Sequence, residues 1–330
     1  MKRMVTLTGL LALTVVAGIG RSGAQADERV SALGEILRQE FDLGGARSPG
    51  TRYFDIVTTL VNFGADGKRG DTETFRAKLK CVSRGDAARA AEQYTCGRFV
   101  YVRPDGTQVT IPTLEGWTYP FKKTETGYDE KGQVLGIDHS KFQQLTDSNG
   151  DCLGPDKSYM IYNTFIDFHA FCDAFAAPVA EGKGIQHLTR IGQRIVHAAA
   201  HTTPPTNLGG NIKDGSYFKN GEITLSLKGL SIIDDAPCAV VEFDSGASSF
   251  QMLMEPMPNM EVKTIGASHY FGDIHVDLAS RWPRKVDMRE LIISETKVPI
   301  PGNPKPMTVN SVQERQTAIR AVTKAAYEKL

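Results

Sequence analysis

Residues 223–243 have the sequence ITLSLKGLSIIDDAPCAVVEF, and this stretch decides the fold class. Apolar and polar side chains alternate up to Ile232, Asp234 and Asp235 follow as turn formers, and a second apolar run ends at Phe243. Alternation on both sides of a short turn is typical of an antiparallel hairpin. The sequence therefore predicts a mainly β protein.

The chain on either side of this hairpin has the same pattern. Segments rich in aromatic and β-branched residues, separated by turn formers, are the predicted strands: 53–63, 74–81, 94–103, 108–111, 117–123, 261–269, 272–278 and 285–295. Short connections between such strands favour antiparallel meanders. We expect one or more curved antiparallel meander sheets.

Two segments depart from the β pattern. Residues 28–41 carry apolar side chains at helical spacing before Gly44-Gly45, which predicts a short N-terminal helix. Residues 158–175 (SYMIYNTFIDFHAFCDAF) repeat large side chains at helical spacing, among them Phe165, Phe168 and Phe175. This spacing predicts an aromatic helix packed on the sheet, although the aromatic content also suits a strand.

The expected organisation has three parts. Residues 1–26 form a signal peptide, 27–178 a β-rich module that contains both helices, and 179–330 a C-terminal antiparallel meander. The alternatives are one continuous domain over 27–330 and an α+β layout of two modules joined near 176–184. A curved sheet with a helix on its concave face resembles the half-barrel architecture of periplasmic lipid and lipoprotein carriers.

The signal peptide is predicted from three features of the first residues. Lys2 and Arg3 precede an uncharged apolar run over 5–20, and Ala24-Gln25-Ala26 supplies a small-x-small cleavage pattern. The apolar run is short for a membrane anchor, which needs about 20 residues. We therefore expect an exported protein, periplasmic or secreted, with no transmembrane segment after cleavage.

Composition excludes several classes of protein. With 41% hydrophobic and 23% charged residues, the chain is neither disordered, collagen-like nor a coiled coil. The formal net charge is zero, which gives no indication of a nucleic-acid partner. Oligomeric state and any cofactor are not indicated.

The five cysteines allow one specific prediction. Cys81 ends one predicted strand and Cys96 lies near the start of the next, so the two flank one connection. In an oxidising compartment such a placement favours a disulfide across the hairpin, with two buried thiols as the alternative. Cys152, Cys172 and Cys238 cannot all pair with one another.

No common catalytic signature occurs in the chain. G-x-S-x-G, the phosphate-binding loop, H-E-x-x-H, C-x-x-C and G-x-G-x-x-G are all missing. We therefore expect a non-catalytic binding protein for an apolar small molecule, a lipid or a partner's apolar segment. Its expected ligand-binding residues are aromatic and sulfur-containing: Phe165, Phe168, Phe175, Met252, Met254, Met257 and Met260.

Two other groups of residues indicate alternative functions. The spacing of the methionines at 252, 254, 257 and 260 resembles the methionine motifs of periplasmic copper-handling proteins. Thioethers favour Cu(I), so this segment could bind that ion. Met-rich segments also fill cores or form pliable surfaces. His269, Asp273, His275 and Asp277 could bind the metal of an envelope enzyme, or could be the solvent-facing side of a strand. A structural envelope protein without a ligand fits the same sequence.

Overall fold

The computed structural model describes the chain in segments, and it divides into two units, 1–39 and 40–330. The described residues are 34–44, 47–64, 66–84, 92–120, 137–174, 184–196, 202–203, 205, 208, 211–219 and 221–329. The predicted signal peptide and Phe175 lie outside them. In the first unit, residues 34–38 are helical, within the helix predicted for 28–41. All further description concerns the second unit.

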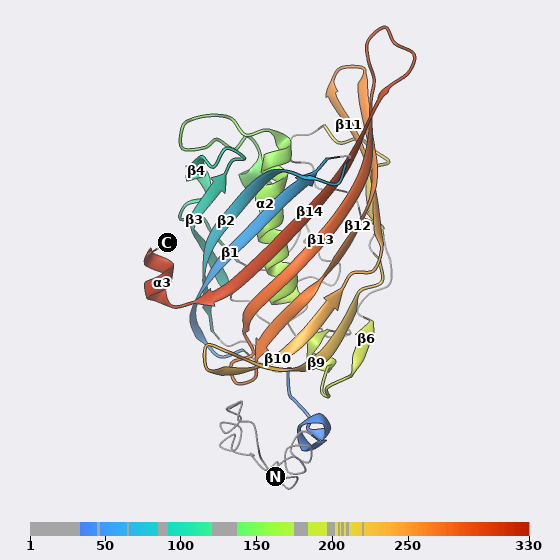
Figure 1. Cartoon of the computed structure of the whole chain (residues 1–330). Helices are drawn as coiled ribbons and strands as arrows, with labels where there is room; N and C mark the ends of the chain where they lie inside the picture. The colour runs from blue at the N-terminus through green and yellow to red at the C-terminus, as the bar shows by residue number, and fades with distance from the viewer. Residues whose placement is uncertain are drawn as a thin grey trace. The chain divides into compact units, whose positions relative to one another are not determined.

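A single antiparallel sheet forms the second unit, which confirms the predicted fold class (Figure 1). Its main path has the order β4-β3-β2-β1-β14-β13-β12-β10-β9-β6, while β11, β5, β7 and β8 pair beside this path. The strands are β1 Gly50–Phe63, β2 Arg69–Ser83, β3 Gln93–Val102, β4 Gln108–Thr110, β5 Thr118–Pro120, β6 Arg194–Val196, β7 Thr202–Thr203, β8 Tyr217–Lys219, β9 Thr224–Ile233, β10 Ala236–Asp244, β11 Ser248–Met257, β12 Met260–Asp277, β13 Pro283–Val298 and β14 Met307–Val322.

Strands from both predicted modules belong to this one sheet. β1 lies in the first module and pairs with β14, the last strand of the second, with Thr58 opposite Thr317. The order of pairing is otherwise mostly that of a meander, because β1–β4 and β12–β14 are sequential neighbours.

The aromatic helix α2 (Pro155–His169) lies against the concave face of the curved sheet (Figure 1). Its last residues continue into a π-helical segment, Ala170–Ala174. Phe165 and Phe168 are fully buried. The Phe165 ring stacks 5.8 Å from Phe99 of β3, and the Phe168 ring meets Phe54 of β1 edge-on at 5.0 Å.

The remaining helices are short. Three 3₁₀ turns cover Pro112–Leu114, His139–Phe142 and Ile185–His187, and helix α3 covers Lys324–Lys329. None of the described helices is both long and apolar enough to cross a bilayer.

Several β segments differ from the prediction, among them β14, for which no strand was predicted. Residues 261–269 and 272–278, predicted as separate strands, form the continuous strand β12. Gly272 lies inside it at a φ of 156°, which L side chains rarely adopt, and a Cβ at this position would overlap the Asp287 carbonyl oxygen, so glycine allows the strand to continue here. In the methionine-rich segment Pro256 and Pro258 favour a loop, but this segment forms the hairpin β11–β12, in which Met257 pairs with Met260.

The predicted Cys81–Cys96 disulfide is wrong. Cys81 lies opposite Tyr94 and Cys96 lies opposite Leu79, so the two cysteines are offset by two residues along the paired strands. Such diagonal neighbours are about 7–8 Å apart, beyond the roughly 4.4–6.8 Å between Cα atoms that a disulfide needs. None of the five cysteines forms a disulfide. Burial raises the pKa of both thiols, that of Cys96 to about 12.

A buried cluster of charges joins the π-helical segment to the start of the sheet. Arg47 is 2% exposed, and its Nη1 lies 2.7 Å from Asp173 Oδ1 and 3.9 Å from Glu92 Oε2. The same guanidinium donates to the carbonyl of Cys172 and lies 4.2 Å from the centre of the Trp282 ring. Arg47 thus connects its own segment to three others, those that contain Glu92, Asp173 and Trp282.

The Asp173 carboxylate is the centre of this cluster. It accepts hydrogen bonds from Tyr94 at 3.0 Å and binds His169 Nδ1 at 2.7 Å. The Nε2 of His169 lies 2.8 Å from the Tyr119 hydroxyl. Both Asp173 and His169 are fully buried, so the cluster belongs to the interior rather than to a cavity wall.

A second buried cluster lies between α2 and β12–β14. Arg315 Nε is 2.9 Å from Glu290 Oε2, and its Nη2 is 3.6 Å from Asp167 Oδ1. Asp167 also accepts hydrogen bonds from Thr317 at 3.1 Å and Tyr270 at 3.3 Å. Burial raises the pKa of Asp167, while burial and the charge of Asp167 raise that of Glu290.

We expect Glu290→Gln to change how stability depends on pH. Folding raises the pKa of Glu290 well above its ordinary 4.5, so its stabilising contribution is complete below that pH and is lost as the pH rises toward the folded pKa. The variant's unfolding free energy relative to wild type should therefore rise with pH. In the pH range where Glu290 is protonated in the folded wild type but ionised in the unfolded chain, this difference in unfolding free energy should rise by about 1.4 kcal/mol per pH unit. Urea unfolding of both proteins between about pH 4 and pH 8 measures it, and a pH-independent difference contradicts it.

Candidate functional site

Met252 and Met254 lie on the face of β11 that is continuous with the concave face of the sheet. They are two residues apart on one strand, so their side chains point the same way. Met254 is opposite Val262 of β12, which is 8% exposed. The hairpin therefore presents these two thioethers to the interior of the fold.

These methionines line a cavity of about 380 Å³ between β11, the first turns of α2 and the paired strands β1 and β14. Its apolar lining is Leu60, Pro155, Tyr159, Met160, Leu208, Ile212, Met252 and Met254. Its polar lining is Asn62, Glu73, Asp156, Lys157 and Gln313. A volume of roughly 300–1,000 Å³ with mostly apolar walls and few polar groups is typical of small-molecule sites.

Charged side chains form one part of the cavity wall. The Glu73 carboxylate on β2 is 5% exposed, and Lys157 Nζ lies 2.7 Å from its Oε2. Tyr101 of β3 donates to the other carboxylate oxygen, Oε1. Burial raises the pKa of Tyr101, and its hydrogen bond to Glu73 raises it further. The hydrogen bond and charge of Glu73 outweigh burial and raise the pKa of Lys157. The Glu73 carboxylate thus has one contact to an ammonium group and one to a hydroxyl group.

An amide pair forms another part of the wall. Gln313 of β14 donates from Nε2 to Asn62 Oδ1 of β1 at 2.8 Å. Among the described residues, no further hydrogen bond involves the Asn62 amino group or the Gln313 carbonyl oxygen. This pair can therefore offer one donor group and one acceptor to a molecule in the cavity.

The polar groups of the cavity wall are few, and two of them form an ion pair. The Lys157 ammonium and the Glu73 carboxylate are paired with each other, and the other polar groups are amides and Asp156. Thioether, aliphatic and aromatic walls bind apolar groups, and the polar groups orient them.

Comparisons with known proteins do not assign this chain to a family. No protein-family model matches it, and no curated protein matches it. A solved structure to which it is similar is OmpT, an outer membrane protein of Vibrio cholerae in its trimer form. That similarity has 9% sequence identity and a TM-score of 0.20, and covers 83% of this chain and 100% of OmpT. A likeness this weak carries no argument about fold or function.

Two of the aromatic side chains predicted to bind a ligand lie in the hydrophobic core instead. Phe165 and Phe168 are packed among the rings of the core, and neither lines the cavity. The Phe165 ring also meets Trp117 at 5.7 Å and Phe142 at 5.5 Å. Phe175 lies outside the described residues.

The four methionines are divided between two places. Met252 and Met254 line the cavity, whereas Met257 is 56% exposed and pairs with Met260 at the hairpin end. A register shift separates Met254 from Met257. Two thioethers of the predicted copper motif therefore share one wall, and Cu(I) binding stays a prediction.

Three of the four predicted metal ligands on β12 have separate partners. His269 Nε2 lies 2.9 Å from Asp244, His275 Nδ1 lies 2.8 Å from Ser231, and Asp277 pairs with Arg284 at 2.7 Å. Asp273 is opposite Asp287 of β13. Over the described ranges, no group of three or more His, Cys, Asp or Glu side chains could hold a metal ion.

Electrostatics at these positions follow from the same contacts. Burial and the charge of Lys285 lower the pKa of His275. Hydrogen bonds from the Ser280 backbone N–H and from Arg284 outweigh burial and lower the pKa of Asp277. The surroundings of His275 and Asp277 in the sheet and its turn thus explain the direction of both pKa shifts.

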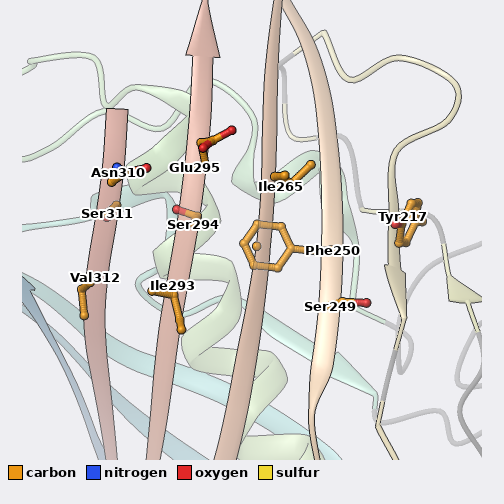
Figure 2. A pocket seen from close by; sticks show the side chains of 11 residues that line it. Tyr217, Ser249, Phe250, Ile265, Ile293, Ser294, Glu295, Asn310, Ser311 and Val312 are labelled. Atoms are coloured by element: carbon orange, nitrogen blue, oxygen red, sulfur yellow. The ribbon is translucent and has the colours of Figure 1, made fainter. Parts of the chain in front are cut away.

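A second hollow, of about 550 Å³, is lined by residues of β8 and β11–β14 (Figure 2). Ile265, Ile293 and Val312 line this hollow and are 43%, 59% and 46% exposed. It is open, and nothing in the described part of the chain shows what covers it.

Sequence reasoning missed the polar part of the cavity. Asn62 lies two residues after the buried Leu60, and Glu73 lies two residues before the buried Phe75. Each therefore occupies an inward position of its strand. A polar residue at the next inward position of a strand with alternating buried residues was the signal that could have located this wall.

Proposed function

We propose that this protein binds an apolar or amphipathic small molecule in the cavity lined by Met252, Met254 and Met160. The observation that carries the proposal is a cavity of about 380 Å³ with mostly apolar walls and a few polar side chains. Pliable thioether side chains suit ligands of varied shape. Together with the export expected from residues 1–26, this makes the protein a ligand-binding protein of the cell envelope.

The proposal predicts saturable binding of an uncharged hydrophobic dye, N-phenyl-1-naphthylamine, with one site per chain. Met254→Trp should weaken binding by about tenfold or more, because the larger side chain fills space that the ligand needs. Met257→Trp is the matched control and should bind as wild type does, because Met257 is 56% exposed at the hairpin end. Dye fluorescence measures both affinities, and thermal unfolding verifies that each variant is folded.

Two results would contradict the proposal. One is a dye signal that does not saturate with the folded wild-type protein. The other is equal affinity for wild type and a folded Met254→Trp variant, which would place the dye somewhere other than this cavity.

A further inference from the structure

The charged wall of the cavity carries more negative than positive charge. Glu73 and Asp156 contribute two carboxylates, and Lys157 contributes the single ammonium among the described lining residues. The nearby Lys213 and Glu255 pair with each other at 2.8 Å, so they leave this balance unchanged. The formal charges of these described lining side chains therefore sum to −1.

Lys157 is already neutralised by this wall. Its Nζ lies 2.7 Å from Glu73 and 3.3 Å from Asp156. A ligand carboxylate that approached Nζ would meet both of these carboxylates, and like charges brought together oppose binding. The most exposed of the three charged side chains is Asp156, at 73%, whereas Glu73 is 5% exposed. A head group entering from solvent therefore meets an anion at the opening.

We infer that the cavity takes an amphiphile whose apolar chain lies against the methionines and whose head group is a cation, such as an alkylammonium. This inference rests on the proposed function and names its ligand class. The apolar chain contacts Met252, Met254 and Leu60, while the ammonium lies beside Asp156. The Asn62–Gln313 amide pair offers a donor and an acceptor to a polar substituent near the head group.

The test compares three ligands that share one chain and differ in charge: dodecylammonium, dodecanol and dodecanoate, each displacing the bound dye at neutral pH. We expect dodecylammonium to bind most tightly and dodecanoate most weakly, with about a tenfold ratio between them at low salt. Added salt should reduce this ratio, because it screens charges at an exposed opening.

Asp156→Asn should reduce the preference for dodecylammonium over dodecanoate by about threefold or more, since the formal charges of the described lining side chains then sum to zero. Asp235→Asn is the matched control. It removes one carboxylate from the exposed β9–β10 turn, and asparagine tolerates the φ of 61° at this position. The control should keep the wild-type ratio.

The outcomes separate the two proposals. If none of the three ligands displaces the dye, or the dye itself does not bind, the proposed function fails. If dodecanol binds but dodecanoate binds as tightly as dodecylammonium, only the cationic head group is overturned. An unchanged ratio in Asp156→Asn overturns the role of that carboxylate and with it this inference.

Discussion

Arg47→Met is expected to lower the free energy of unfolding by about 3–5 kcal/mol, the cost of breaking a buried ion pair by removing one partner. Methionine keeps much of the volume of arginine but cannot donate to Asp173 or to the Cys172 carbonyl. The Asp173 carboxylate would then remain fully buried without its guanidinium. The contact with the Trp282 ring would also change from a cation to a thioether.

Urea unfolding at neutral pH measures this loss. The control is Arg190→Met, whose guanidinium pairs with Glu40 at a site where both side chains are more than 60% exposed. Exposed ion pairs contribute about 0–1 kcal/mol, so the control should stay close to wild type. A loss below about 1 kcal/mol for Arg47→Met would show that the buried cluster does not depend on this residue.

Phe168→Ala is expected to destabilise the protein by a similar amount, about 3–5 kcal/mol, through lost burial and the cavity left behind. Phe168 is fully buried, and its ring lies 5.0 Å from Phe54 and 5.7 Å from Tyr94. The contacts with Phe54 and Tyr94 connect α2 to β1 and β3. Thermal and urea unfolding measure the loss.

The control for this prediction is Ile232→Ala. Ile232 is 70% exposed near the β9–β10 turn, so its truncation should change the unfolding free energy by less than about 0.5 kcal/mol. Equal stability of the two variants would contradict the assignment of Phe168 to the core.

Local pattern was sufficient to predict the fold class and the aromatic helix. Alternating residues at 223–243 became the hairpin of β9 and β10, and the helical spacing of Phe165 and Phe168 placed both against the sheet. These predictions succeed because periodicity determines which side chains share a face, and the shared face is the one that is buried.

Register and long-range contacts could not be predicted in this way. The Cys81–Cys96 disulfide was predicted on the assumption that the two cysteines face each other across the strands. In the structure they are offset by two residues. The cavity depends on bringing Met254 of β11 close to Lys157 of α2, which are far apart in the chain. Spacing within one segment carries no information about such neighbours, whereas the inward positions of Asn62 and Glu73 were visible in principle.

The pairing of β1 with β14 has a consequence for how the protein folds. Thr58 and Thr317 are 259 residues apart in the chain but neighbours across the sheet. Chains with many such distant contacts fold slowly, because a long loop must close before its contacts stabilise it. The centre of the sheet can therefore form only after the last strand has been synthesised, which leaves the edges of β1 and β13 unpaired until then. The β1–β14 pairing, which joins β2–β4 to the strands from β13 onward, thus closes the longest loop in the sheet.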